Sequence, residues 1–213
     1  MRHLKLRPPL VYLITEGKLT AENFDKESKR VLETIEEAVS FGIPLIQIRE
    51  KKLPARLVFQ LTKEAVRIAE RKFPDSNTKI LVNERADIAY VAKAHGVHLP
   101  ECSIPAEVIR KVFPKDFIIG VSCHDIQACL DSVSSGVDFV TFSPIFSTPN
   151  KGQPKGLQAL KEVCEKLKPF PVIALGGINE ENYKEVLKIA SGFAAIRFFS
   201  DRSNLKKLSE ILA

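Results

Sequence analysis

The chain has 213 residues, of which 45% are hydrophobic and 27% are charged, a composition typical of a globular protein with a substantial core. The net charge at pH 7 is +6, but the basic residues are scattered among acidic ones and form no block interleaved with aromatic residues, so no nucleic-acid partner is expected. No apolar run approaches the roughly 20 residues that span a bilayer, so no membrane segment is expected either.

Short apolar runs alternate with longer amphipathic stretches along the chain. The runs, each expected to be a buried strand, are residues 11–15, 45–49, 79–83, 96–99, 117–123, 139–144, 171–177 and 192–197. Between the first two runs, Val31, Ile35 and Val39 recur every four residues, which predicts a helix ending near Gly42 and Pro44. The stretch "RLVFQLTKEAVRIAERKFP" after the second run repeats this pattern and also ends at a proline.

Eight such runs, each followed by helical or loop sequence, predict a right-handed series of βα units. Eight units in 213 residues fit one compact (β/α)8 TIM barrel, a single domain covering residues 1–213. The alternative is a doubly wound open sheet, which would carry a glycine-rich turn after its first strand. The corresponding stretch, "ITEGKLTAENF", contains one glycine, and this favours the barrel.

The second run contains the most informative polar residues. In "PLIQIREKKLP", Gln47, Arg49 and Lys51 occupy alternate positions, so they share one face of the chain while Ile46 and Ile48 share the other. Burying the polar face without a partner would cost several kcal/mol. The guanidinium of Arg49 has a geometry suited to phosphate oxygens. An anionic ligand is therefore expected beside this strand.

Barrel enzymes carry their chemistry on the loops that follow the strands, and further polar residues lie at those positions here. They are Asn83, Glu84, Ser122, His124, Ser143, Thr148, Asn150, Lys151, Gly176, Gly177 and Arg197. The loop "SPIFSTPNKGQPKGL" either closes over a ligand or is a passive connector. The Gly-Gly pair either lets the backbone approach a phosphate near a helix N-terminus or serves a tight turn. His124 is a candidate acid or base, or a capping histidine.

The remaining cysteines and histidines give no metal or disulfide signal. The four cysteines show neither a CxxC pair nor zinc-ligand spacing, so buried reduced thiols are expected at Cys102, Cys123, Cys129 and Cys164. A Cys123–His124 nucleophile pair is disfavoured, because strand neighbours point to opposite sides. His95 and His98 are interpreted as packing residues rather than metal ligands. The N-terminal apolar run is too short for a signal peptide and no cleavage site follows it, so a cytoplasmic location is expected.

The ordered set of motifs resembles the thiamine phosphate synthase family and its close relative TenI, the thiazole tautomerase. The motifs are "QIREK", "VNERADIA", "AHGVHL", "GVSCHD", "SPIFSTPNKG" and "VIALGGI", and the likeness extends from "VYLIT" to "GFAAIR". The synthases join a pyrimidine pyrophosphate to a thiazole phosphate and release pyrophosphate. The resemblance implies that reaction here, in thiamine biosynthesis, with small phosphorylated substrates, Mg²⁺, and a monomer or homodimer.

The resemblance also implies roles for individual residues. Those expected to hold the pyrimidine pyrophosphate are Gln47, Arg49, Lys51, Asn83, Ser122 and Lys151. Those expected at the thiazole phosphate are Thr148, Asn150 and Gly177, with Arg197 filling part of the phosphate pocket or binding the phosphate itself. The candidate catalytic residues are Arg49, Lys51, Ser122, His124 and Lys151.

The sequence departs from the synthase pattern at the two positions that the synthases use to bind Mg²⁺. The two aspartates that the synthases place for Mg²⁺ correspond to Glu84 and Ser103. Glu84 keeps an oxygen ligand for a hard cation, whereas Ser103 is a poor substitute, with Glu101 nearby. The second threonine of the family's "TPT" loop is Asn150, and Arg197 replaces a small serine-containing turn.

These departures leave two alternatives to a divergent synthase. One is a TenI-like tautomerase, which needs no metal pair and uses a histidine at the position of His124 as acid and base. The other is a barrel that binds thiazole or thiamine phosphates without catalysis. "QIREK" has the synthase pattern, while His124 is compatible with both enzymes.

Overall fold

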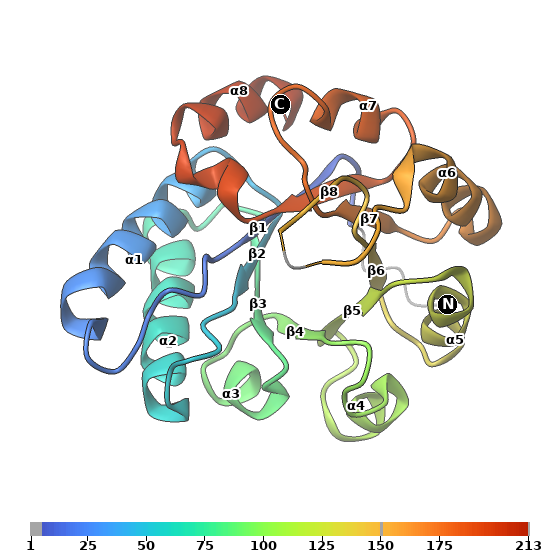
Figure 1. Cartoon of the computed structure of the whole chain (residues 1–213). Coiled ribbons are helices and arrows are strands. Elements are labelled where there is room, and N and C mark those ends of the chain that lie inside the picture. The colour runs from blue at the N-terminus through green and yellow to red at the C-terminus, as the bar shows by residue number, and fades with distance from the viewer. Residues whose placement is uncertain (1–5, 150, 213) are drawn as a thin grey trace.

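The computed structural model describes residues 6–149 and 151–212. Within these residues, eight parallel strands close into one barrel in chain order, with β8 paired to β1 (Figure 1). The strands are β1 Leu10–Ile14, β2 Leu45–Ile48, β3 Lys79–Asn83, β4 Gly96–Leu99, β5 Ile118–Cys123, β6 Phe139–Phe142, β7 Val172–Leu175 and β8 Gly192–Ala195. The expected (β/α)8 architecture is confirmed, and each expected run contains a strand.

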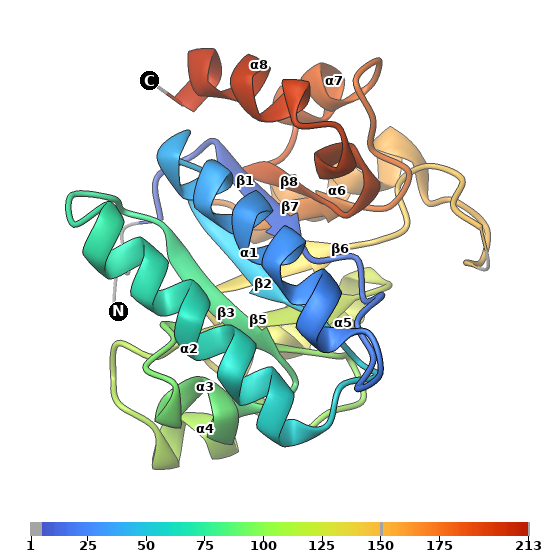
Figure 2. The ribbon, with the colours of Figure 1, turned by 90° about the vertical axis from the view of Figure 1, so that its left-hand side faces the viewer.

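Helices pack around the outside of the barrel, and α1 and α2 lie side by side along it (Figures 1 and 2). The helices are α1 Phe24–Ser40, α2 Ala55–Lys72, α3 Ala86–Val91, α4 Ala106–Val112, α5 Ile126–Ser134, α6 Gly156–Leu167, α7 Tyr183–Leu187, α8 Ser203–Leu212 and the 3-10 helix η1 Arg197–Ser200. The periodic residues Ile35 and Val39 are buried, which confirms the predicted inner face of α1. None of the described helices is long and apolar enough to cross a membrane.

The alternation of side chains along each strand divides the core into two parts. In β2, Ile46 and Ile48 belong to the large cluster between the barrel and its helices. Leu45 belongs to the smaller cluster inside the barrel, together with Tyr12 and Phe139. The predicted two-faced character of this strand is thus confirmed, although β2 ends at Ile48 and the residues that follow lie in a loop and turn.

The cysteines follow the expectation only in part. All four are free thiols, and Cys123 and Cys129 are buried. Cys164 is half-buried, and Cys102 is exposed in the loop between β4 and α4. The prediction that all four are buried was therefore wrong for Cys102 and Cys164. Loop residues that follow a strand carry no burial periodicity, so the sequence pattern could not place Cys102.

Candidate active site

A cavity of about 700 Å³ opens at the carboxyl ends of the strands. Among the residues expected in the site, those that line the cavity are Gln47, Arg49, Lys51, Asn83, Ser122, His124, Thr148, Lys151, Gly177 and Arg197. They come from loops and strand ends around most of the barrel. Asn150 lies outside the described residues. Glu84 and Ser103 lie within them but do not line the cavity.

Arg49 follows the last residue of β2, and the loop between β1 and α1 holds it in place. The backbone N–H of Arg49 donates to Oγ1 of Thr15 at 2.8 Å. The next residue, Glu50, is only 4% exposed, and its carboxylate accepts the N–H groups of Gly17 at 3.1 Å and Leu19 at 2.9 Å. A Cβ on Gly17 would lie 3.2 Å from the Arg49 carbonyl oxygen, so the loop packs directly against this residue.

A polar layer inside the barrel forms part of the cavity floor. Gln47 is buried, and its Nε2 donates to the Tyr12 hydroxyl at 2.9 Å. His98 is also buried, and its Nε2 lies 2.9 Å from Oγ of Ser122. Burial, and then the charge of Arg49, lowers the pKa of His98 to about 3. The ring that holds Ser122 is therefore uncharged near neutral pH.

The two histidines interpreted as packing residues differ in their surroundings. The ring of His98 lies 5.6 Å from that of Tyr12 and 5.8 Å from that of Phe139, so packing inside the barrel is confirmed. His98 also lines the cavity, which sequence reasoning missed. The Nδ1 atom of His95 instead accepts the backbone N–H of Ile80 at 3.0 Å.

The side chain of His124 lines the cavity, and that of its neighbour Cys123 points to the other side of the strand. Its Nδ1 lies 2.9 Å from the carbonyl oxygen of Ser143, and its Nε2 lies 4.0 Å from Oε2 of Glu101. The sulfur of Cys123 instead points to α5, where it lies 3.4 Å from Oγ of Ser132. The two side chains thus point to different sides, as expected, which disfavours a nucleophile pair, and His124 lies beside a carboxylate as an acid–base candidate.

The Gly-Gly pair after β7 packs tightly against the loop that follows β6. Gly177 has a φ of +66°, and a Cβ there would lie 2.7 Å from both the Phe146 Cβ and the Ser147 carbonyl oxygen. The N–H of Phe146 donates to the carbonyl oxygen of Gly176 at 3.0 Å. The expected helix N-terminus does not stand beside this pair, because α7 begins only at Tyr183. The glycines therefore join two loops of the cavity wall.

Four cations line the cavity, two from the loop after β2, one from the loop after β6 and one from the start of η1. They are Arg49, Lys51, Lys151 and Arg197. Within residues 6–149 and 151–212, none of the four forms an ion pair with a carboxylate. Like charges that converge without counter-ions repel one another, so this wall favours a ligand with several negative charges.

The structure does not support the predicted metal position. Glu84 is exposed outside the cavity, with a φ of +64°, and Ser103 also lies off the wall. In the part of the chain that the structure describes, no three His, Cys, Asp or Glu side chains gather into a metal-binding group. Glu180 and Asp201 line the cavity, but Glu180 pairs with Lys207 at 2.5 Å. The side chain of Asp201 accepts a backbone N–H.

Glu101 is the remaining acidic residue among those described at the cavity wall. Among residues 6–149 and 151–212, its ionic neighbour is His124, whose Nε2 lies 4.0 Å from Oε2 of Glu101. Mg²⁺ commonly binds through one or two carboxylates together with substrate phosphates and water. The residues present therefore fit a cation held through Glu101 and a bound phosphate, rather than through Glu84 and Ser103.

Thr15, Gly17 and Glu50 are further residues that sequence reasoning missed. One sequence feature could have identified them. Glu50 is charged, and alternation places it on the side of the chain opposite to Arg49. A carboxylate on that side must find donors, and the donors are backbone N–H groups of the neighbouring loop.

The chain is similar to several known proteins along most of its length. The family model described as thiamine monophosphate synthase matches residues 11–199. The chain is 43% identical to the Aquifex aeolicus protein named "Putative thiamine-phosphate synthase 2", covering 90% of this chain and 97% of that one. It is 31% identical to the thiamine-phosphate synthase of Clostridium novyi, covering 95% and 96%. The solved thiamine phosphate pyrophosphorylase of Pyrococcus furiosus superposes with a TM-score of 0.77 at 28% identity, covering 95% and 96%.

Proposed function

The chain belongs to the thiamine monophosphate synthase family, and on that premise we propose that its cavity joins a hydroxymethylpyrimidine pyrophosphate to a thiazole phosphate. One observation carries the proposal. The cations Arg49 and Lys51 on the β2 side and the glycine-containing wall after β7 line the same cavity. A synthase needs both halves, because it must hold two phosphorylated substrates at once.

The pyrophosphate binds between Arg49, Lys51 and Lys151 in this proposal. Arg49 contributes a two-pronged donor, and the two lysines contribute mobile point charges. Ser122 and Asn83 complete the pocket with neutral donors. Gln47 holds the pyrimidine from the barrel interior, where its amide is oriented by Tyr12.

The reaction breaks one bond and makes one. The C–O bond between the pyrimidine methylene carbon and the pyrophosphate breaks, and its electron pair leaves with the pyrophosphate oxygen. The lone pair of the thiazole nitrogen then forms the new C–N bond, which gives thiamine phosphate and pyrophosphate. Negative charge grows on the leaving group, so cations fixed before the reaction lower the barrier.

The thiazole phosphate binds on the opposite wall, near Thr148 and Gly177, with Arg197 as a direct phosphate ligand. Arg197 lies at the start of η1, and its guanidinium has no carboxylate partner among the described residues. Asn150, which is also predicted to contact this phosphate, follows Thr148 by two positions in the sequence. Positioning the thiazole nitrogen against the pyrimidine is the main contribution of this wall.

Mg²⁺, which the family resemblance implies, would reduce the charge of the bound pyrophosphate. Glu101 is the carboxylate that fits this role, and Glu84 as a ligand would require its loop to turn. The proposal includes a cytoplasmic enzyme, which the four free thiols support. It includes no nucleic-acid or membrane partner.

A metal-independent thiazole tautomerase is the second candidate, and the His124–Glu101 pair favours it. A histidine beside a carboxylate at a cavity wall can move a proton on a bound thiazole. A thiazole phosphate occupies only one anion site. In a tautomerase the unpaired cations on the β2 side would therefore have no anion to bind. A barrel that binds these phosphates without turnover is the third possibility.

One assay separates the three candidates. The purified protein is mixed with the pyrimidine pyrophosphate and thiazole phosphate, with and without Mg²⁺, and thiamine phosphate is oxidised to fluorescent thiochrome. Product that requires Mg²⁺ and forms much more slowly in Arg49→Ala supports the synthase. Absence of product, together with isomerisation of the thiazole that is lost in His124→Gln, overturns it in favour of the tautomerase. Binding without either turnover leaves the third candidate.

A further inference from the structure

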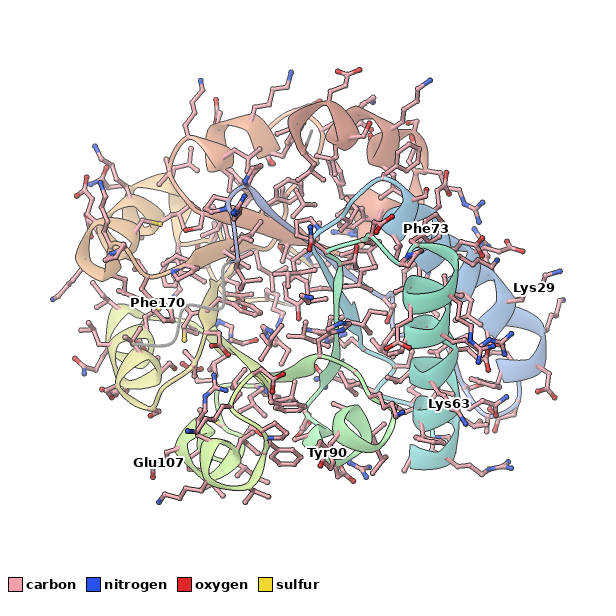
Figure 3. All side chains as sticks on the ribbon, turned by 180° about the vertical axis from the view of Figure 1, so that it is seen from behind. Lys29, Lys63, Phe73, Tyr90, Glu107 and Phe170 are labelled. Carbon is pink, nitrogen blue, oxygen red and sulfur yellow. The ribbon has the colours of Figure 1, made fainter. Side chains whose placement is uncertain are left out.

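His98 of β4 and Ser122 of β5 lie on neighbouring strands and meet at the floor of the cavity. Side chains from the strands fill the middle of the barrel (Figure 3). His98 is only 3% exposed, and its Nε2 lies 2.9 Å from Oγ of Ser122, which lines the cavity. Either atom can be the donor in this hydrogen bond. The choice decides where the single hydroxyl proton of Ser122 goes.

The ring of His98 is neutral and therefore carries one N–H. Burial, and then the charge of Arg49, lowers the pKa of His98 to about 3. In a neutral ring one nitrogen is a donor and the other an acceptor, and the surroundings of the two nitrogens select the tautomer. A proton on Nε2 makes His98 the donor to Ser122, whereas a proton on Nδ1 makes Ser122 the donor to His98.

Nδ1 of His98 faces a part of the barrel that offers no acceptor. Within residues 6–149 and 151–212, this atom has no hydrogen-bond partner. Gly120 pairs with His98 in the sheet, and a Cβ at Gly120 would lie 2.8 Å from Nδ1 and 2.3 Å from Cζ of Phe139. A water at that point would therefore overlap the Phe139 ring. Buried N–H groups without an acceptor are rarer in proteins than under-satisfied buried acceptors, so the packing favours a proton on Nε2.

A pyrophosphate in the cavity requires the same tautomer. Its ionised oxygens only accept hydrogen bonds, and Ser122 has one proton to donate. That proton can go to Nε2 of His98 or to the ligand, but not to both. When His98 carries its proton on Nε2, the hydroxyl of Ser122 is free to donate into the cavity. Among the described residues, the hydroxyl has no other hydrogen-bond partner.

We infer that His98 is a positioning residue that donates its Nε2–H to the oxygen of Ser122, so that the hydroxyl proton of Ser122 is directed at a pyrophosphate oxygen. This role rests on the proposed function, which gives Ser122 the pyrophosphate as its acceptor. A hydroxyl that is oriented before the ligand arrives loses less freedom on binding. His98 therefore acts on the pyrophosphate through Ser122.

Nitrogen-15 NMR of the full chain with labelled histidine rings measures the tautomer directly. Protonated and unprotonated ring nitrogens resonate far apart, and the chain has four histidines. At pH 7 we expect a proton on Nε2 of His98 and none on Nδ1, with and without inorganic pyrophosphate and Mg²⁺. His95 is the internal reference, because its Nδ1 accepts the Ile80 N–H at 3.0 Å. A proton on Nδ1 of His98, or on both nitrogens, would overturn the inference.

Isothermal titration calorimetry with inorganic pyrophosphate and Mg²⁺ tests the role of His98 in binding. Ser122→Ala should weaken binding at least about tenfold. His98→Met should weaken it about two- to tenfold, because the hydroxyl loses the donor that orients it. His98→Gln should lose less than His98→Met, since its amide can still donate. His95→Gln is the control and should leave binding unchanged, because His95 does not line the cavity.

The double variant separates an action through Ser122 from a direct contact. In a Ser122→Ala background, His98→Met should weaken pyrophosphate binding no further. Equal losses in both backgrounds, or wild-type protein that does not bind pyrophosphate, would overturn the inference. Circular dichroism and thermal unfolding check the fold of each variant. Neither readout needs turnover, so the expected tautomer and binding pattern would support the role of His98 even if absence of thiamine phosphate contradicted the proposed reaction.

Discussion

The carboxylate of Glu50 accepts the backbone N–H of Leu19 at 2.9 Å, across 31 positions of the sequence. Its other oxygen accepts the N–H of Gly17. These bonds tie the loop after β1 to the end of β2, directly beside Arg49. The guanidinium that faces the cavity therefore stands on a backbone fixed by a buried carboxylate on the opposite side of the chain.

Glu50→Gln should lower kcat/KM for the pyrimidine pyrophosphate by about ten- to hundredfold, because the new amide NH₂ faces a backbone N–H and the loop must shift. Stability should fall by roughly 1–3 kcal/mol. Steady-state kinetics and urea unfolding measure the two effects. Glu36→Gln, which removes an ion pair with Lys72 on the outside of α1, is the control and should leave the kinetics unchanged.

The Glu50 effect should depend on Arg49. In an Arg49→Ala background, Glu50→Gln should cost little further activity, because the group that it positions is gone. Equal losses in both backgrounds would show that Glu50 supports the fold without orienting the guanidinium.

Lys51→Ala should raise KM for the pyrimidine pyrophosphate by about tenfold, the loss of one charge-assisted contact. Lys52→Ala is the matched control, because Lys52 is an exposed cation next along the chain that does not line the cavity. Initial rates at varied pyrophosphate substrate and saturating thiazole phosphate give both values. Equal effects of the two substitutions would indicate a general electrostatic attraction and no specific contact.

Gly177→Ala should raise KM for thiazole phosphate by about tenfold, since the new Cβ at 2.7 Å from Phe146 and Ser147 pushes the β6–α6 loop away. Gly42→Ala carries the same kind of backbone strain, with a φ of +73°, but its Cβ would meet nothing within 4 Å. Gly42→Ala should lose about 1–2 kcal/mol of stability from the left-handed backbone, and Gly177→Ala should lose more because its Cβ also overlaps neighbouring atoms. Only Gly177→Ala should change the kinetics. An unchanged KM for thiazole phosphate in Gly177→Ala would show that the contact with the β6–α6 loop does not shape the phosphate site.

His95 should make the protein less stable in acid. Burial, and then the charge of Lys79, lowers the pKa of His95 to about 4, from about 6.5 in an unfolded chain. Between these values the unfolded state binds more protons than the folded one, so stability rises with pH through this window and its loss is complete only below pH 4.

Urea unfolding from pH 4.5 to 7 measures the slope of stability against pH. His95→Gln should reduce that slope by up to about 1.4 kcal/mol per pH unit, the value for one proton. An amide nitrogen or oxygen at this position still lies beside the Ile80 backbone that His95 contacts. A slope identical to that of the wild type would show that His95 binds the same number of protons in the folded and unfolded states, which contradicts a lowered pKa.

The barrel could be predicted because its strands are short apolar runs at a regular spacing and its helices carry a period of about four residues. The direction of Gln47 followed from strand alternation in the same way, and Arg49 and Lys51 line the same cavity although β2 ends at Ile48. Loop geometry has no such period. Glu84 was expected at a metal, but it follows Asn83, and neighbouring residues at a strand end face opposite sides, so Asn83 lines the cavity and Glu84 does not.

The contacts that cross between loops could not be predicted from local pattern. Glu50 accepts hydrogen bonds from backbone N–H groups 31 and 33 positions earlier in the sequence. His98 lies within hydrogen-bond distance of Ser122 on the neighbouring strand. These pairings depend on the register between strands, which places His98 beside Gly120 of β5. The family resemblance supplied the identity of the substrates, which no single residue in the cavity specifies.

The central claim is that one cavity couples two phosphorylated substrates, and the ratio of its two products tests this most directly. Thiamine phosphate, measured as thiochrome, and inorganic pyrophosphate should be counted in the same reaction with Mg²⁺ present. The account predicts equal amounts of both, and no pyrophosphate when thiazole phosphate is omitted. Pyrophosphate released without thiamine phosphate, or neither product from folded protein that binds both substrates, would contradict it.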